Sequence, residues 1–595
     1  MKRAARLLVP LAAAVVALAY SGRVVAPTPS RSLAGFMPQG AILYLEAADF
    51  GGLLREWSGS PERQAWLESD NFAAFSRSKL VLRLESAQRE FAAAAGIPPD
   101  SQFLAPAAGG ESALALYNIG KLQFLFVSRM PAAQAMQSGL WRERGSFQSR
   151  AAGGVAFYVR TDPQSGRVAA FAVADNYLLL STREDLLAGA LAMLAGGNAP
   201  SLASESWYRD AIAAAGSPGE LRLVLAMDKI AATPYFRSYW IPRNISELGA
   251  YRAAISDFHR EGSVDREERV LLPKLASAAP AQASPGTGAY PLAGQPPVPA
   301  SAQRAAAELL RLVPADAGFY RVVAGPSAAE CLSLVKASVL FPRIGPGPPS
   351  PMAPSVRLTG GVVGQASDLE TRIDVAPPEF PQAGGGWEAF GKLIEGAGVQ
   401  AALFVGSSDQ DPRIGFVGNR LVVVLAASTP WKAADVRDAL TAAIGQEVTT
   451  ASLGAGWTSN GTQADGTFVL NGLLHAGFAV RGSDLFLAND AGTLASLLAA
   501  TTASPGLPAP EPMIYAAGSH LTAERQNFTR LAAALDPSSP REGNPYQGAR
   551  RQPPSFFSGN VGSLSGVLGG VVSEEMTIRQ SGGDERQTVV YRWGR

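Results

Sequence analysis

The chain has 595 residues, of which 47% are hydrophobic and 17% are charged. This length exceeds what one hydrophobic core can support and predicts two to four domains, while the composition excludes a largely disordered chain and a multi-span membrane protein. With 51 Lys and Arg against 50 Asp and Glu, the net charge is +1, and no basic run occurs. Nucleic acid is therefore not expected as a partner, because phosphate binding needs a concentrated basic face.

The N-terminus reads as an export signal. Lys2, Arg3 and Arg6 precede an apolar run of 14 residues, Leu7 to Tyr20. That length suits a signal-peptide core and falls short of the roughly 20 residues that cross a bilayer. Residues 1–19 are predicted to be a signal peptide, or alternatively a short uncleaved N-terminal anchor, followed by a tether over 20–36. Both alternatives predict a periplasmic or other extracytoplasmic location.

A hairpin that leads into a helix occurs twice. Each copy has a strand beginning Phe-Ala-Val, a tight turn, a second apolar strand and a helix, and the copies span 171–194 and 478–498. Thr182 with Asp185 predicts a capping box at the first helix. Asn489 followed by Asp490 predicts a cap and a negative charge at the start of the second.

Two further segments match in the same order. The hairpin 113–127 precedes a helix after Pro131, and a second hairpin over 416–425, with its turn at Gly418-Asn419, precedes a helix after Pro430. The openings also agree, MPQGAILY from Met37 beside VPADAGFY from Val313. The matched positions are separated by 276, 299 and 307 residues along the chain. Preserved order with a growing offset is what duplication followed by insertion produces.

These patterns predict an α+β fold of two tandem divergent repeats, each a mainly antiparallel sheet with helices packed on one face. The expected boundaries are 37–274 and 305–595, joined by a linker over 275–304 that is rich in Pro, Ala, Gly and Ser. Cutting this linker is expected to release two separately folded halves. Pro-rich insertions at 341–355 and 537–555 are expected to be surface loops of the second repeat. Ser60-Pro61 and the apolar face that ends at Gly96 predict helices particular to the first repeat.

The strand that opens after a Pro, the hairpin-then-helix modules and the paired halves resemble uncharacterised exported bacterial proteins that carry a duplicated domain of unknown function. The resemblance is one of pattern and covers most of residues 37–595. It implies an exported location and an α+β architecture, and it transfers no site residue.

Signatures of chemistry are sparse. The three histidines, His259, His475 and His520, have no spacing suited to a metal, and the single cysteine, Cys331, lies in a helical pattern where a small apolar residue is the default interpretation. No phosphate loop, dinucleotide fingerprint or nucleophile elbow occurs. We therefore predict no catalytic residue, no cofactor and no metal site.

Two S-x-x-K tetrads, Ser76 to Lys79 and Ser333 to Lys336, have the helical Ser–Lys spacing of penicillin-recognising serine enzymes. Those enzymes also need a K-T-G strand, which this sequence lacks. Asp368, Glu370 and Asp374 could share one strand face, either as a cation site or as an exposed face with Arg372 among them.

The aromatic segment Tyr235, Phe236, Arg237, Tyr239 and Trp240 is the best candidate for a partner contact. At helical spacing one aromatic pair would pack on the sheet, and the other could meet an envelope protein, a glycan or a membrane surface. The sequence thus favours an exported, non-catalytic binding or scaffold protein of the cell envelope. The competing hypotheses are an S-x-x-K serine hydrolase that acts on peptidoglycan or a β-lactam, and a carrier of an apolar ligand. The oligomeric state is not predicted.

Overall fold

In the computed structural model of the chain, the described residues are 32–77, 79–97, 106–234, 249–274, 297–315, 317–340, 343–344, 386–408, 417–448, 455–459, 467–471, 476–503, 507, 513–522, 524–525, 569–581 and 583–594. They form two compact units. The first unit contains 32–274 and 569–594 of these residues, and the second contains 297–525. Within the described residues, no helix is long and apolar enough to cross a membrane.

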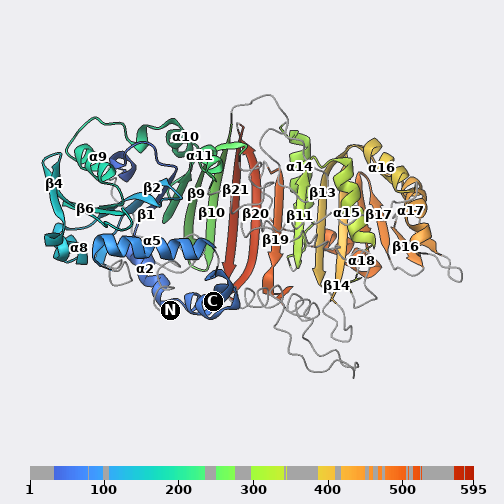
Figure 1. The fold of residues 1–595 in the computed structure, drawn as a ribbon. Coiled ribbons are helices and arrows are strands. Elements are labelled where there is room, and N and C mark those ends of the chain that lie inside the picture. Colours follow the sequence, from blue (N-terminus) through green and yellow to red (C-terminus); the bar gives the residue numbers. More distant parts are fainter. Residues whose placement is uncertain are drawn as a thin grey trace, which may run out of the picture. The chain divides into compact units, whose positions relative to one another are not determined.

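The first unit is built on one antiparallel sheet (Figure 1). From one edge to the other its strands are β4 (Gln148–Ala152), β5 (Val155–Thr161), β6 (Val168–Ala174), β7 (Tyr177–Ser181), β3 (Gln123–Arg129), β2 (Ser112–Asn118), β1 (Leu43–Ala47), β8 (Leu221–Leu225), β9 (Tyr251–Glu261), β10 (Val264–Pro273), β21 (Asp584–Trp593) and β20 (Val571–Ser581).

The main strands of the second unit are also antiparallel (Figure 1). Its strand order is β15 (Gly456–Ser459), β16 (Thr467–Asn471), β17 (Gly477–Arg481), β18 (Asp484–Ala488), β14 (Val417–Ala427), β13 (Val399–Ser408), β11 (Phe319–Ala324) and β19 (Tyr515–His520), with the short β12 (Arg343–Ile344) beside β14. Taken in chain order, these eight strands occupy the same sheet positions as β1 to β8 of the first unit.

Helices cover both faces of each sheet, which corrects the expectation of a single covered face. In the first unit, Ala170 and Ala172 of β6 pack under α9 (Glu184–Leu194), while Phe171 on the opposite face packs against α5 (Lys79–Ala95). The reason is the composition of the central strands, which are apolar at consecutive positions and must exclude water on both sides.

The same arrangement holds in the second unit. Val422 and Val424 of β14 face the cluster formed with α14 (Ala300–Leu310) and α18 (Ala491–Ala503). Val423 and Leu425 face the cluster formed with three other helices, α15 (Ala328–Leu340), α16 (Gly386–Ala397) and α17 (Ala433–Val448).

The remaining helices of the first unit are mostly short. They are α2 (Phe50–Gly59), α3 (Pro61–Glu68), α4 (Asp70–Phe75), α7 (Ala132–Ala135), α8 (Gly139–Arg142), α10 (Ser206–Ala214) and α11 (Met227–Ala232), with 3-10 turns η1 (Leu33–Phe36), η2 (Glu143–Ser146) and η3 (Leu202–Ser204). The predicted helix start at Ser60-Pro61 is confirmed, because the Ser60 hydroxyl accepts a hydrogen bond from the Arg63 amide of α3.

The C-terminal hairpin pairs with the last strand of the first repeat. β21 pairs with β10 from Val264 opposite Arg592 to Leu271 opposite Glu585. Residues 571–593 therefore group with the first compact unit, although the sequence places them in the second repeat. Local sequence could not reveal this, because either neighbouring edge strand can accept a polar-alternating hairpin.

Two local predictions were wrong. Gly418-Asn419 is not a turn, since β14 runs straight through it and pairs Asn419 with Ser408 of β13. Thr182 and Asp185 form no capping box. The Thr182 hydroxyl accepts from the Phe124 amide of β3 and donates to the Leu122 carbonyl, while Asp185 pairs with Arg183. The Thr182 hydroxyl hydrogen-bonds to the backbone of the neighbouring strand and is therefore not available to cap the helix.

The cap predicted at Asn489 was wrong by one residue, because Asp490 caps the helix: its carboxylate accepts from the Thr493 amide at 2.7 Å. Asn489 has a different role, because its side-chain oxygen accepts from the Leu421 amide of β14 at 2.9 Å. Asn489 thus ties β18 to β14 as Thr182 ties β7 to β3.

Candidate functional site

Five charged side chains form a row across the sheet of the first unit, and the row shifts by two residues between Glu46, which is opposite Ala113, and Glu111. They come from five adjacent strands or strand ends and are Arg129 (β3), Glu111 (before β2), Glu46 (β1), Arg222 (β8) and Asp257 (β9). Glu46 lies opposite Arg222 in the strand register, and Arg222 lies opposite Asp257. The Arg129 amide bonds to the Glu111 carbonyl at 2.8 Å. We name these five residues the charge row.

The Arg222–Asp257 end of the charge row is deeply buried. The guanidinium donates two hydrogen bonds to the carboxylate, at 2.7 and 2.8 Å. Arg222 also donates to the Gly216 carbonyl at 3.2 Å, and the Gly219 amide donates to Asp257 at 3.2 Å. Burial alone would lower the pKa of Arg222, but the hydrogen bond and charge of Asp257 raise it. A Cβ at residue 219 would collide with the Phe258 carbonyl, so the approach that delivers this amide needs glycine.

Glu46 occupies the middle of the row. Burial raises the pKa of its carboxyl group, and the nearby Glu111 carboxylate raises it further. The Tyr44 hydroxyl, which donates to Glu46 at 3.1 Å, and the charge of Arg222 oppose that increase. Tyr44 is itself fully buried against the edge of Tyr208, with ring centroids 5.4 Å apart. Glu46 therefore holds a proton more readily than an exposed glutamate does.

The opposite end of the row reaches solvent. Arg129 pairs with Glu111 at 3.1 Å, and these side chains are 34% and 21% exposed. The Arg129 guanidinium also lies over the Tyr177 ring, 5.4 Å from its centroid. The row thus passes from a buried, fully hydrogen-bonded ion pair to a partly exposed pair that an approaching molecule could contact.

The same sheet positions in the second unit are apolar. Glu46 corresponds to Val322, because both lie on the equivalent strand opposite the partners Arg222 and Ala516. By the same register, Glu111 and Arg129 correspond to Ala401 and Ala426. All four of these counterparts are buried in one cluster beneath α14. Apolar side chains can therefore occupy these positions of the sheet. The fold does not require the charged residues of the first unit.

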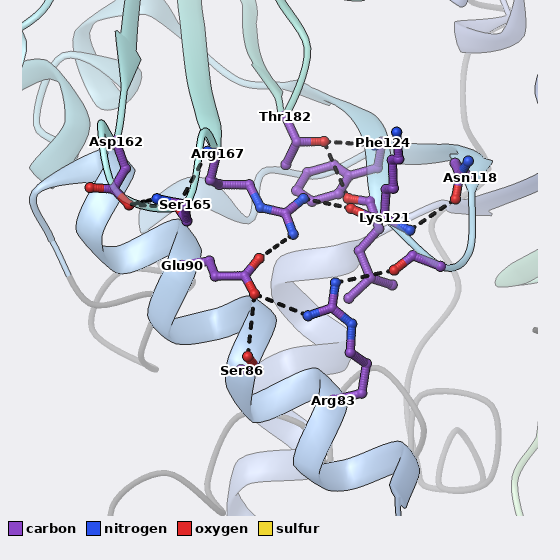
Figure 2. Close-up of polar contacts among 12 residues, drawn as sticks. Arg83, Ser86, Glu90, Asn118, Lys121, Phe124, Asp162, Ser165, Arg167 and Thr182 are labelled. Atoms are coloured by element: carbon purple, nitrogen blue, oxygen red, sulfur yellow. Dashed lines mark hydrogen bonds and ion pairs between the residues drawn. The ribbon is translucent and has the colours of Figure 1, made fainter. Parts of the chain in front are cut away.

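A second polar cluster lies on the α5 face of the first unit and has a structural explanation. Figure 2 shows Glu90 of α5 between Arg83, Arg167 and Ser86. Arg83 also donates to the Gly120 carbonyl, and Arg167 to the Lys121 carbonyl. These bonds fasten α5 to the β2–β3 turn and to the start of β6. The Arg167 and Arg83 hydrogen bonds hold the pKa of Glu90 below its usual range.

Most of the residues that the sequence singled out lie outside the described residues. This applies to the aromatic segment Tyr235, Phe236, Arg237, Tyr239 and Trp240, to the acidic set Asp368, Glu370 and Asp374, and to His475. His259 is in β9 and His520 in β19. Cys331 is buried in α15, and burial raises the pKa of its thiol to about 12, so it remains a protonated apolar-like side chain.

The serines of the S-x-x-K tetrads can be placed. Ser76 lies in the turn between α4 and α5, and its hydroxyl donates to the Ala73 carbonyl at 3.0 Å. Ser333 is exposed on α15, and the Lys336 amine lies 5.3 Å from the centroid of the Trp387 ring. Within the described residues, no group of three or more His, Cys, Asp or Glu side chains could hold a metal ion.

Sequence reasoning missed the charge row. A signal was present, since Glu46 and Arg222 each interrupt a short apolar strand at the phase of its buried residues. Such a charge needs a partner, but the partner comes from another strand, which a single segment does not reveal.

Comparison with known proteins gives no assignment. No family model matches this chain. No curated protein sequence matches it either. Among solved structures, crystal form IV of TP0453 has 12% identity and a TM-score of 0.23, over 41% of this chain and 81% of that one. Crystal form III of TP0453 has 12% identity and a TM-score of 0.22, over 42% and 83%. Likeness at this level says nothing about function.

Proposed function

We propose that this chain is an exported, non-catalytic binding or scaffold protein of the cell envelope. In this proposal it consists of two copies of one α+β unit, and the charge row of the first copy contacts a polar group of its partner. The main support comes from comparing the two units. Where the first unit has Glu46, Glu111, Arg129 and Arg222, the second unit has buried apolar residues at the matching positions.

The duplication is supported by the hairpins β9–β10 and β20–β21. Residues of the two hairpins correspond at a constant separation of 320, as in 251 and 571 or 273 and 593. Both hairpins pair across the same turn, with Glu261 opposite Val264 and Ser581 opposite Asp584. The irregularity in each ladder also falls at the corresponding place, after Leu272 in one and after Arg592 in the other. Bulges at matched sites are features that related sheets retain.

Aromatic packing gives a second line of support. Tyr158 stacks on Phe171 with ring centroids 5.2 Å apart, and Phe468 stacks on Phe478 at 4.8 Å. A third ring meets each stack edge-on, Phe147 at 5.2 Å in the first unit and Trp457 at 5.0 Å in the second. The three-ring arrangement uses corresponding strands in both units, which unrelated sheets would not be expected to share.

The energetics of the charge row support a role beyond folding. Replacing a buried ion pair by apolar residues of similar size is often neutral or stabilising by about 1–4 kcal/mol. The second unit already has the apolar solution. A first unit that keeps five charges accepts a desolvation cost that packing alone does not require. A partner that pairs with the exposed Arg129–Glu111 end would offset this cost.

The hydrolase hypothesis receives less support from the geometry. A serine activated by lysine needs the amine beside the hydroxyl and away from water. The Lys336 amine instead contacts the Trp387 ring, and an aromatic face attracts the ammonium form. We expect neither Ser76 nor Ser333 to be labelled by a fluorophosphonate or a β-lactam. Stoichiometric acylation of either serine would establish an enzyme.

The decisive experiment replaces the charge row with the residues found at the matching positions of the other repeat. The full-length variant Glu46→Val, Glu111→Ala, Arg129→Ala, Arg222→Ala and Asp257→Thr removes the whole row, with Thr taken from the matching Thr577. We expect its thermal stability to equal or exceed that of the parent. By contrast, Arg222→Ala alone should cost about 3–5 kcal/mol, because it leaves the buried Asp257 carboxylate unpaired.

Partner binding is the second measurement. Tagged mature protein is used to capture partners from envelope extracts, comparing the parent, the five-residue variant and a control in which the exposed pair Arg150–Glu184 is changed to alanine. We expect a partner that is retained by the parent and the control and lost by the variant. If the five-residue variant unfolds readily, the row serves folding and the proposal is wrong. If capture is unchanged in a stable variant, the contact lies elsewhere.

A further inference from the structure

The junction between β10 and β21 has an internal symmetry. The strands are antiparallel, and the register places Glu268 opposite Thr588 at the middle of the paired stretch. With the separation of 320 that relates the two hairpins, Thr588 is the counterpart of Glu268 itself. Val264 then pairs with the counterpart of Leu272, and Leu271 with the counterpart of Asp265. A local two-fold axis therefore passes between Glu268 and Thr588.

A two-fold pairing of equivalent strands is the geometry of a homodimer contact, in which one patch meets its own copy. We infer that the β10 edge also accepts the β20–β21 hairpin of a second copy of this chain, in place of the chain's own hairpin. The inference rests on the duplication within the proposed function and is independent of the role of the charge row. One chain therefore contains both strands of this contact, β10 and β21. Two separate copies could form the same contact by exchanging their hairpins.

One cross-strand pair distinguishes β21 from a second β10 as the partner of β10. Two β10 strands in this register would place Glu268 directly opposite Glu268, and like charges in that position are destabilising. In the observed pairing Glu268 faces Thr588, which carries no charge. The same register would also place Glu267 opposite Arg269 on both sides of the axis, so the like-charge contact distinguishes the two partners only at residue 268.

Exchange between chains depends on concentration. Fifty residues, 521–570, separate β19 from β20 in the sequence. Pairing within one chain gives the hairpin an effective concentration on the order of 1 mM at β10 of its own chain. After unfolding and refolding at about 0.1 mM protein, roughly a tenth of the hairpins should therefore pair with another molecule, and fewer at lower concentration.

The test uses full-length cysteine variants at a facing pair, Arg266→Cys in β10 and Val590→Cys in β21. Opposed antiparallel positions have Cα separations of about 4.5–5.5 Å, within the range that a disulfide bridges. The native Cys331 is buried and does not compete. The double variant should form an intrachain disulfide in the monomer. The two single variants, refolded together and oxidised, should form a mixed disulfide dimer whose yield rises about tenfold between 0.01 and 0.1 mM protein.

Three comparisons make the result interpretable. The same single variants mixed without unfolding should give no dimer. Adding Thr588→Glu should reduce both disulfides, because it restores the like-charge pair at the axis, while Thr588→Ser should not. Absence of the intrachain disulfide would show that the register is wrong. An intrachain disulfide without a concentration-dependent mixed dimer would overturn the inference that β10 accepts a second copy, and would leave the duplication intact.

Discussion

At the scale of single residues, the main feature is a carboxyl group whose environment differs between the two units. Glu46 is held among Tyr44, Glu111 and Arg222 in the first unit, and Val322 stands at the matching position of the second. A buried glutamate next to another carboxylate binds a proton more tightly in the folded protein than in the unfolded chain. Its contribution to stability must therefore change with pH.

The sign of this pH dependence follows from the raised pKa of Glu46. Its stabilising contribution is fully present below the unfolded-state pKa of about 4.3 and is lost as the pH rises through the higher folded-state value. Glu46→Gln keeps an acceptor for Tyr44 and removes the ionisation. We expect the variant to gain melting temperature relative to the parent at pH 8 and to differ little at pH 4. An equal shift at both pH values would contradict this assignment.

Glu90 provides a control of opposite sign. The pKa of its carboxyl group is lowered by Arg167 and Arg83, so its stabilisation is present above the unfolded-state pKa and is lost as the pH falls. Glu90→Gln should therefore lower the melting temperature at pH 8 and have little effect near pH 3. Thermal unfolding of both variants across this pH range separates ionisation from general effects of a Glu to Gln change.

At the scale of elements, each unit depends on its three-ring stack. Phe171 and Phe478 are fully buried and contact both of their aromatic neighbours. The rings join the hairpin of β6 and β7, or β17 and β18, to the strands beside it. This explains how two sheets with different loops keep the same local packing.

We expect Phe171→Ala and Phe478→Ala each to cost about 3–5 kcal/mol, because a large cavity replaces a well-packed ring. Differential scanning calorimetry should show each change lowering the transition of its own unit. Leu82→Ala is the control, since Leu82 is 53% exposed and its truncation should cost less than about 0.5 kcal/mol. If either Phe variant matches the control, that stack contributes little to its unit.

At the scale of the whole molecule, the C-terminal hairpin makes the first unit discontinuous in sequence. Its sheet takes residues 43–273 from one part of the chain and 571–593 from the other end. This bears on the sequence-based expectation that cutting the linker separates the two halves. The strand that pairs with β10 lies in the C-terminal fragment, so the fragments remain joined by backbone hydrogen bonds.

A protease site introduced between residues 285 and 290 tests this point. After cleavage we expect the two fragments to elute together in size-exclusion chromatography and to separate in denaturant. Val589→Pro, which removes a backbone donor from the middle of β21, should let the cleaved fragments separate under native conditions. Separation of the cleaved parent without that substitution would show that the β10–β21 pairing does not hold the fragments together.

The sequence by itself determined the local features of this protein. Strand alternation, Pro at helix starts and small polar turn residues locate most hairpins of the first unit, its helix start at Ser60 and, within one residue, the Asp490 cap, because neighbouring residues decide those structures. The turns at Asp175 and Gly482 also follow from sequence, since both need a positive φ that these residue types tolerate. The α+β class follows from the same local patterns.

Only the tertiary structure decided how distant segments combine. Strand pairing decides which edge accepts β21 and why both sheet faces are covered. It also brings together Glu46, Glu111, Arg129, Arg222 and Asp257 from five strands or strand ends. The paired residues are up to 328 positions apart, as Val264 and Arg592 are. Local propensity carries no information about such pairs, because their free energy comes from register, burial and charge compensation that exist only after the chain has folded.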